Sequence, residues 1–143
     1  MAADGGQRGD TRVRDQEEQA MPFAAITYDI KAGYEKEISE IFRTFRRVGS
    51  PVVRDEAGGE TARILSTAVF LRDATMVRLI EYEGDLDAVA RHMARQPGVQ
   101  EVERKLAPYL SRPRDTGTVE GFVATFRRSL LPCLAQMSVR DAA

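Results

Sequence analysis

Two neighbouring apolar runs constrain the fold of this chain more than any other feature. Residues 63–71 (RILSTAVFL) and 75–82 (TMVRLIEY) are rich in aliphatic and β-branched side chains, and only residues 72–74 separate them. Runs of this length with so short a connection pair as a β-hairpin. The fold must therefore contain an antiparallel sheet.

Strand and helix patterns lie on both sides of this hairpin. Residues 23–30 alternate in side-chain type and predict a strand, and the apolar stripe of residues 38–45 predicts an amphipathic helix that ends near residues 49–51. After the hairpin, Asp85 is placed to cap a second helix, and residues 99–109 continue at helical spacing. The chain thus supplies a helix before the hairpin and helical segments after it.

The C-terminal part of the chain predicts a helix over residues 119–131 and then a final strand over residues 134–140. Pro132 separates the two, because proline is excluded from helix interiors and is tolerated at strand edges. The order of elements is then that of a ferredoxin-like split βαβ unit. We expect an α+β fold, a ferredoxin-like antiparallel sheet with helices on one face.

Each predicted strand is apolar on both of its faces, so the sheet face without helices also needs a cover. A homodimer in which two sheets close into a dimeric α+β barrel would provide it. Such a barrel encloses a cavity that suits a flat apolar ligand. We therefore expect a homodimer with a ligand cavity between its sheets.

Composition limits the possible functions. The 143 residues fit one domain, and the 21 basic and 22 acidic side chains nearly cancel, which argues against nucleic-acid or membrane partners. Residues 1–20 hold a single aliphatic side chain larger than alanine and predict a flexible N-terminal tail before a domain at residues 21–143. With one cysteine and one histidine, we expect no disulfide, no metal and a cytoplasmic location.

Arg78 is the strongest candidate for chemistry. On its strand the residues of the same parity are Met76, Ile80 and Tyr82, so a charge lies among apolar and aromatic neighbours. If this face lines the cavity, the guanidinium could bind a phenolate or an enolate. The alternative is a structural salt bridge to a nearby carboxylate.

Three further side chains are catalytic candidates. Tyr28 lies in mid-strand, where its ring could stack on a polycycle and its hydroxyl could orient a phenol, and Tyr82 could act similarly. His92 could shuttle a proton, although its arginine-rich helix is also typical of a solvated histidine. The residues expected to line the substrate cavity are Ile26, Ser66, Thr67, Met76 and Ile80.

Several stretches resemble a known family. MPFAAITYDI, SPVVRDE, ILSTAVFLRDATMVRLIEYEGDLDAVARHMARQPGVQEVERKLAPYL and FVATFRRSLL are similar to the SchA/CurD-like proteins of aromatic polyketide clusters, the spore-pigment clusters among them. VRLIE and QPGVQEVERKLAPYL also resemble the tetracenomycin-type polyketide cyclases. Those cyclases are dimeric α+β barrels related to the cofactor-free antibiotic-biosynthesis monooxygenases.

The resemblance implies a role in shaping or oxidising a polycyclic aromatic polyketide intermediate. The leading hypothesis is a monooxygenase without cofactor that converts a phenol or anthrone to a quinone. A cyclase that closes a ring by aldol chemistry is the first alternative, and a non-catalytic dimer that binds the polyketide or scaffolds synthase partners, such as other cyclases, is the second. Arg78 stands where the cyclases look to have a histidine, and the chain has no tryptophan of the kind the monooxygenases use.

Overall fold

The computed structural model describes residues 23–44, 52–54 and 58–139 of the chain. The predicted tail at residues 1–20 lies outside these ranges. The first helix, predicted to end near residues 49–51, already ends at Arg43, with Thr44 as its C-cap. The elements are β1 (Phe23–Asp29), α2 (Glu35–Arg43), β2 (Val52–Arg54), β3 (Glu60–Arg72), β4 (Thr75–Gly84), α3 (Leu86–Ala94), α4 (Pro97–Leu106), the short 3₁₀ helix η1 (Ala107–Tyr109) and α5 (Val119–Ser129).

The four strands form one antiparallel sheet in the order β1-β4-β3-β2. The predicted hairpin is confirmed as β3 and β4, which pair up to Arg72 and Thr75. Asp73 in the turn has φ 54°, a left-handed conformation that aspartate tolerates better than most residues. Pairing to this turn fixes the register, and with it the face on which each side chain of β4 lies.

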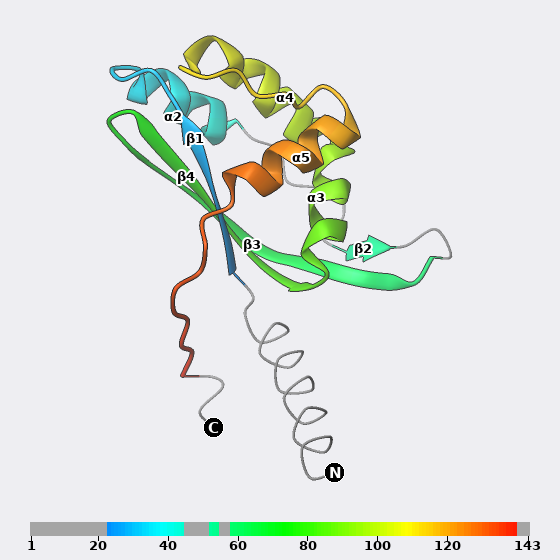
Figure 1. Ribbon diagram of the computed structural model, residues 1–143. Coiled ribbons are helices and arrows are strands. Elements are labelled where there is room, and N and C mark those ends of the chain that lie inside the picture. The colour runs from blue at the N-terminus through cyan, green and yellow to red at the C-terminus, as the bar shows by residue number, and fades with distance from the viewer. Residues whose placement is uncertain (1–22, 45–51, 55–57, 140–143) are drawn as a thin grey trace, which may run out of the picture.

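The helices lie on one face of the sheet (Figure 1). α3 contacts α5, α4 and the strands, and α5 also contacts β1. The core lies between these layers, where Ile26 and Ile80 from the sheet are buried together with Phe122 and Phe126 from α5. The α+β, ferredoxin-like architecture expected from the sequence is thereby confirmed.

The prediction of a final strand at residues 134–140 is wrong for residues 134–139, which the structure describes. After α5, Leu130 makes a single bridge to Ile26 and the Leu131 N–H donates to the Ala25 carbonyl at 2.8 Å. No strand follows in residues 132–139. Pro132 has no N–H to donate, so the hydrogen bonds between this segment and β1 do not continue beyond Leu131.

The strand that the sequence did not predict is β2, three residues at the other edge of the sheet. It pairs with β3 and buries Val53. The chain after α5, where a final strand was predicted, runs past β1 and away from the helices in Figure 1. None of the helices in the described ranges is both long and apolar enough to cross a lipid bilayer.

Candidate functional site

The strand residues with the strongest functional signal lie beneath the helices. Ile26 and Tyr28 on β1, and Met76, Arg78 and Ile80 on β4, are all buried on this face. Our expectation was a cavity between two sheets, lined by this face. The structure differs because the chain's own helices cover it, which leaves the opposite face, with residues such as Val77 and Leu79, for any partner sheet.

Arg78 is 2% exposed in mid-sheet, opposite Ile26 on β1 and Val69 on β3. A hydrogen bond from its side chain to Tyr28, together with its charge, acts to lower the pKa of the Tyr28 hydroxyl. Two carboxylates close in sequence to these strand residues could have paired with Arg78, namely Glu81 and Asp29. Glu81 points to the other face of the sheet, where it accepts a hydrogen bond from Ser66 at 3.0 Å. Asp29 lies 3.9 Å from Arg112.

A second arginine, Arg114, reaches the same place from the loop between η1 and α5. Its Nε lies 3.3 Å from Oε2 of Glu103 on α4, and the two side chains are 8% and 3% exposed. Its guanidinium carbon lies 4.0 Å from the centroid of the Tyr28 ring, which is cation–π distance. Arg114, Glu103, Tyr28 and Arg78 therefore form one buried group, named here the Tyr28 cluster.

The fold holds the loop of Arg114 at several points. Arg114 Nη1 donates to the Ser129 hydroxyl at 3.2 Å, and the Thr125 hydroxyl donates to the Asp115 carbonyl at 2.9 Å. Gly121 leaves room for the Asp115 carboxylate, since a Cβ there would lie 2.6 Å from its Oδ1 atom. These contacts fix the arginine against α5 and β1.

The cluster carries two guanidiniums and one carboxylate, and is therefore net positive when Glu103 is ionised. Burial raises the pKa of Tyr28, the charge of Glu103 raises it further, and Arg78 and Arg114 oppose both effects. Tyr28 consequently remains a protonated hydrogen-bond donor at neutral pH. The group as a whole suits an oxygen that carries developing negative charge.

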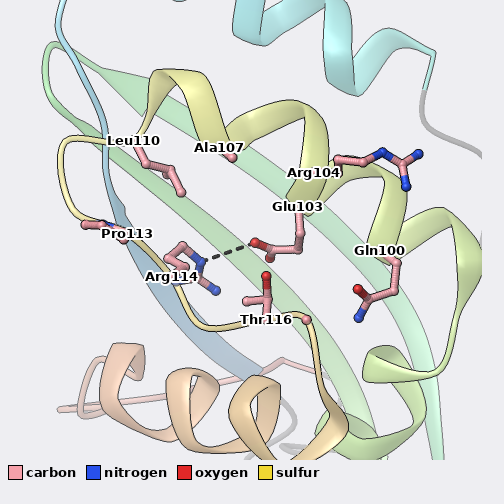
Figure 2. A pocket seen from close by; sticks show the side chains of 9 residues that line it. Gln100, Glu103, Arg104, Ala107, Leu110, Pro113, Arg114 and Thr116 are labelled. Atoms are coloured by element: carbon pink, nitrogen blue, oxygen red, sulfur yellow. Dashed lines mark hydrogen bonds and ion pairs between the residues drawn. The ribbon is translucent and has the colours of Figure 1, made fainter.

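A cavity of about 410 Å³ adjoins the cluster. Figure 2 shows Glu103 and Arg114 joined by their ion pair at the wall of this cavity, with Gln100 and Thr116 pointing into the same space. Oε1 of Glu103 is buried and accepts no hydrogen bond from the described residues. The residues that line the cavity are Gln100, Glu103, Arg104, Ala107, Leu110, Pro113, Arg114, Thr116 and Gly117.

Sequence reasoning missed Glu103 and Arg114. Glu103 had a usable signal, because it stands four residues after Val99 and three before Leu106, on the apolar stripe of α4. Such a carboxylate is buried once the stripe packs. Arg114 had no such signal, since its loop carries no periodicity and its contacts to β1 span 87 residues of sequence.

The remaining polar candidates contact other parts of the structure. His92 on α3 lies 3.3 Å from the side-chain nitrogen of Gln96. Tyr82 lies towards the other end of β4, where burial raises the pKa of its hydroxyl, as do the charges of Asp85 and Cys133. Ser66 is on the open face, and Thr67, opposite Ile80, is exposed.

Two further features bear on ligands. Within the ranges that the structure covers, no three His, Cys, Asp or Glu side chains gather closely enough to hold a metal ion. A second cavity, of about 580 Å³, lies on the open face of the sheet, between Phe23, Ala25 and Leu79 and the segment 131–136. Its lining has no ionisable side chain except that of Cys133. The charged groups that acid–base chemistry needs are therefore those of the Tyr28 cluster.

Comparison with known proteins gives one family. A profile of the SchA/CurD-like domain matches residues 21–139. The chain is 36% identical over 110 residues to "Protein SchA" of Streptomyces halstedii, 33% identical over 110 residues to "Polyketide synthase CurD" of Streptomyces cyaneus, and 34% identical over 117 residues to a "42.8 kDa protein in whiE locus" of Streptomyces coelicolor.

These alignments cover 77–82% of the chain but only 27–28% of each relative. The chain thus corresponds to little more than a quarter of those proteins. No solved structure matches it.

Proposed function

Because the chain belongs to the SchA/CurD-like domain family, we propose that it tailors an aromatic polyketide by oxidising a polycyclic phenol or anthrone to a quinone with dioxygen and without a cofactor. The name of the Streptomyces cyaneus relative, "Polyketide synthase CurD", supports the substrate class. The Tyr28 cluster supports the type of chemistry.

The observation that carries the proposal is a buried, net positive group beside a cavity. A phenol or the enol of an anthrone that loses its proton there becomes an anion, and Arg114, which lines the cavity, can hold that anion through charge-assisted hydrogen bonds. Arg78 lies buried in the same cluster and adds its positive charge without lining the cavity. The cavity volume, about 410 Å³, lies within the usual range for sites that bind small molecules.

The anion is the reactive form of such a substrate. It is electron-rich enough to give electrons to dioxygen directly, so the protein needs only to bind it, stabilise its charge and limit access of water. In the overall reaction an anthrone methylene loses two hydrogens and gains one oxygen atom. The second oxygen atom leaves with those hydrogens as water.

A polyketide cyclase is the second candidate, and one observation favours it. A hydroxyl donor, Tyr28, and a carboxylate, Glu103, lie in the same cluster, and aldol ring closure needs an acid and a base placed together. The guanidiniums would then stabilise an enolate. This reaction would use no dioxygen.

Mass spectrometry of the reaction products separates these candidates. The purified protein is incubated with an anthrone or a phenolic polyketide intermediate, in air and under nitrogen, with protein-free vessels as controls. We expect a quinone in air that is absent under nitrogen. Loss of water in both vessels would establish the cyclase instead, and no product in either would favour a binding or scaffolding role, including one beside other polyketide synthase cyclases.

A further inference from the structure

We propose that Glu103 is the catalytic base of this site and that its Oε1 atom takes the hydroxyl proton of a phenolic ligand. This inference rests on the proposed function, because it names the group that forms the anion. It adds a residue for which sequence analysis gave no role.

The two oxygens of this carboxylate have different environments. Oε2 faces Arg114 at 3.3 Å, whereas Oε1 is buried and accepts no hydrogen bond from the described residues. A buried acceptor without a donor costs roughly 1 to 3 kcal/mol. A ligand hydroxyl in the adjoining cavity would supply the donor that Oε1 lacks.

A purely structural ion pair predicts another geometry. Arginine and carboxylate commonly pair through two parallel hydrogen bonds, which engage both oxygens. Here Arg114 instead donates to Oε2 of Glu103, the Ser129 hydroxyl and the Thr27 carbonyl. One carboxylate oxygen is thus left without a donor from the described residues, on a residue that lines the cavity of Figure 2.

Proton transfer at this position keeps the total charge of the site constant. The O–H bond of the phenol breaks, a bond forms between that proton and Oε1, and the electron pair stays on the phenol oxygen. The negative charge moves from the carboxylate to the phenolate, and both positions lie beside guanidiniums. Since the interior gains no net charge, the transfer avoids the large desolvation cost of creating a buried ion.

The matching ligand class is a polycyclic phenol with a free hydroxyl. An O-methylated analogue has no proton to give and cannot satisfy Oε1, so it should bind more weakly. We choose 2-hydroxyanthraquinone as the probe, because the absorption spectrum of its phenolate differs from that of the neutral phenol. The full-length chain is used throughout.

The test measures whether the bound dye loses its proton and where that proton goes. At a pH well below the pKa of the free dye, the absorption spectrum reports whether the bound dye is ionised. Calorimetry in two buffers of different ionisation enthalpy reports whether a proton leaves the complex. For the wild type we expect a phenolate spectrum and a binding heat that does not depend on the buffer, because Glu103 keeps the proton.

The Glu103→Gln variant has no carboxylate and cannot accept the proton of the dye. This variant should bind the dye either as the neutral phenol or as a phenolate with about one proton released to the buffer. Glu101→Gln, which removes an exposed carboxylate from the same helix, is the matched control and should behave as the wild type. Circular dichroism of each variant verifies its fold.

Three results would overturn the proposal. The first is a neutral bound dye in the wild type, and the second is release of the proton to the buffer by the wild type. The third is a phenolate spectrum in Glu103→Gln with no proton released to the buffer. The first two results need only the wild type, so they test the proposal even if the variant does not fold. Absence of any dye binding to the wild type would instead contradict the proposed function itself.

Discussion

Arg114 and Glu103 meet in an environment nearly closed to water, with side chains 8% and 3% exposed. Removing one partner of such a pair leaves an uncompensated charge in the interior. We predict that Arg114→Met lowers the free energy of unfolding by about 3 to 5 kcal/mol, and that adding Glu103→Leu recovers much of this loss.

Urea denaturation of the single and double variants measures both effects. Arg91→Met is the control, because it breaks a pair with Glu120 whose side chains are 42% and 80% exposed, and it should cost less than about 1 kcal/mol. Equal losses for Arg91→Met and Arg114→Met would show that the buried pair has no special role in stability.

Tyr28 gives the protein a pH dependence at the alkaline end. Burial raises its pKa above the ordinary value of 10.0, so above that pH the unfolded chain releases this proton while the folded protein retains it. Unfolding is therefore favoured as the pH rises from about 10 towards the folded-state pKa, by up to about 1.4 kcal/mol per pH unit. The stabilising contribution is fully present below pH 10.

We predict that Tyr28→Phe makes this alkaline decline shallower, as measured by urea denaturation from pH 8 to 11. Tyr34→Phe, at a residue 41% exposed, is the control and should leave the decline unchanged. A slope for Tyr28→Phe that equals the wild-type slope would contradict the burial of the hydroxyl.

Part of the site could be predicted at the residue scale. Alternation along β1 and β4 was enough to identify Tyr28 and Arg78, because a polar group on a buried strand face stands out. Glu103 was detectable by the same logic on a helix. Arg114 was not, because a loop residue reaches its partners through the tertiary fold and leaves no periodic pattern.

At the scale of elements, the junction between β4 and α3 depends on one glycine. Gly84 has φ +91°, and a Cβ there would meet the carbonyl oxygen of Thr61 and approach Ala62 Cα to 2.8 Å. Backbone atoms of the neighbouring strand cannot move aside easily. We predict that Gly84→Ala destabilises the fold by roughly 2 kcal/mol or more.

Gly58 provides a matched control. It also has positive φ, +86°, but a Cβ there would meet nothing within 4 Å. Gly58→Ala should therefore cost only the strain of its backbone conformation, roughly 1 kcal/mol. Thermal or urea unfolding of both variants tests the difference, and equal costs would show that the close approach at Gly84 is relieved by movement.

The elements were predictable in proportion to their periodicity. The hairpin and the helices follow long periodic patterns, and the structure has them. β2 could not be found, because three residues establish no period. The C-terminal segment was misread because its apolar residues suggested burial, whereas Leu134, Met137 and Val139 are 95%, 96% and 90% exposed.

At the scale of the whole molecule, the open face of the sheet favours a homodimer. The middle of this face is mainly apolar, with Ala25, Val77, Leu79 and Phe70, and Phe70 is 59% exposed. A second copy presents the same face, so a two-fold axis would cover both at once. Hydropathy alone could not tell which apolar face the helices cover and which is left for a partner.

We predict a dimer at micromolar concentration by sedimentation velocity. Phe70→Asp should give a folded monomer, because it places a carboxylate in the interface. Ser39→Asp, which adds the same group to exposed α2, should remain dimeric. A wild-type monomer, or a Phe70→Asp dimer, would contradict this arrangement.

We propose that the Tyr28 cluster generates a bound phenolate that reacts with dioxygen. The most direct measurement is the mass of the product that the wild type and Arg78→Met form from an anthrone under ¹⁸O₂, relative to a vessel without protein. We predict a quinone that carries one ¹⁸O atom, formed by the wild type at least about tenfold faster than by a folded Arg78→Met variant. Equal rates for the two proteins, or no labelled product above the protein-free vessel, would contradict it.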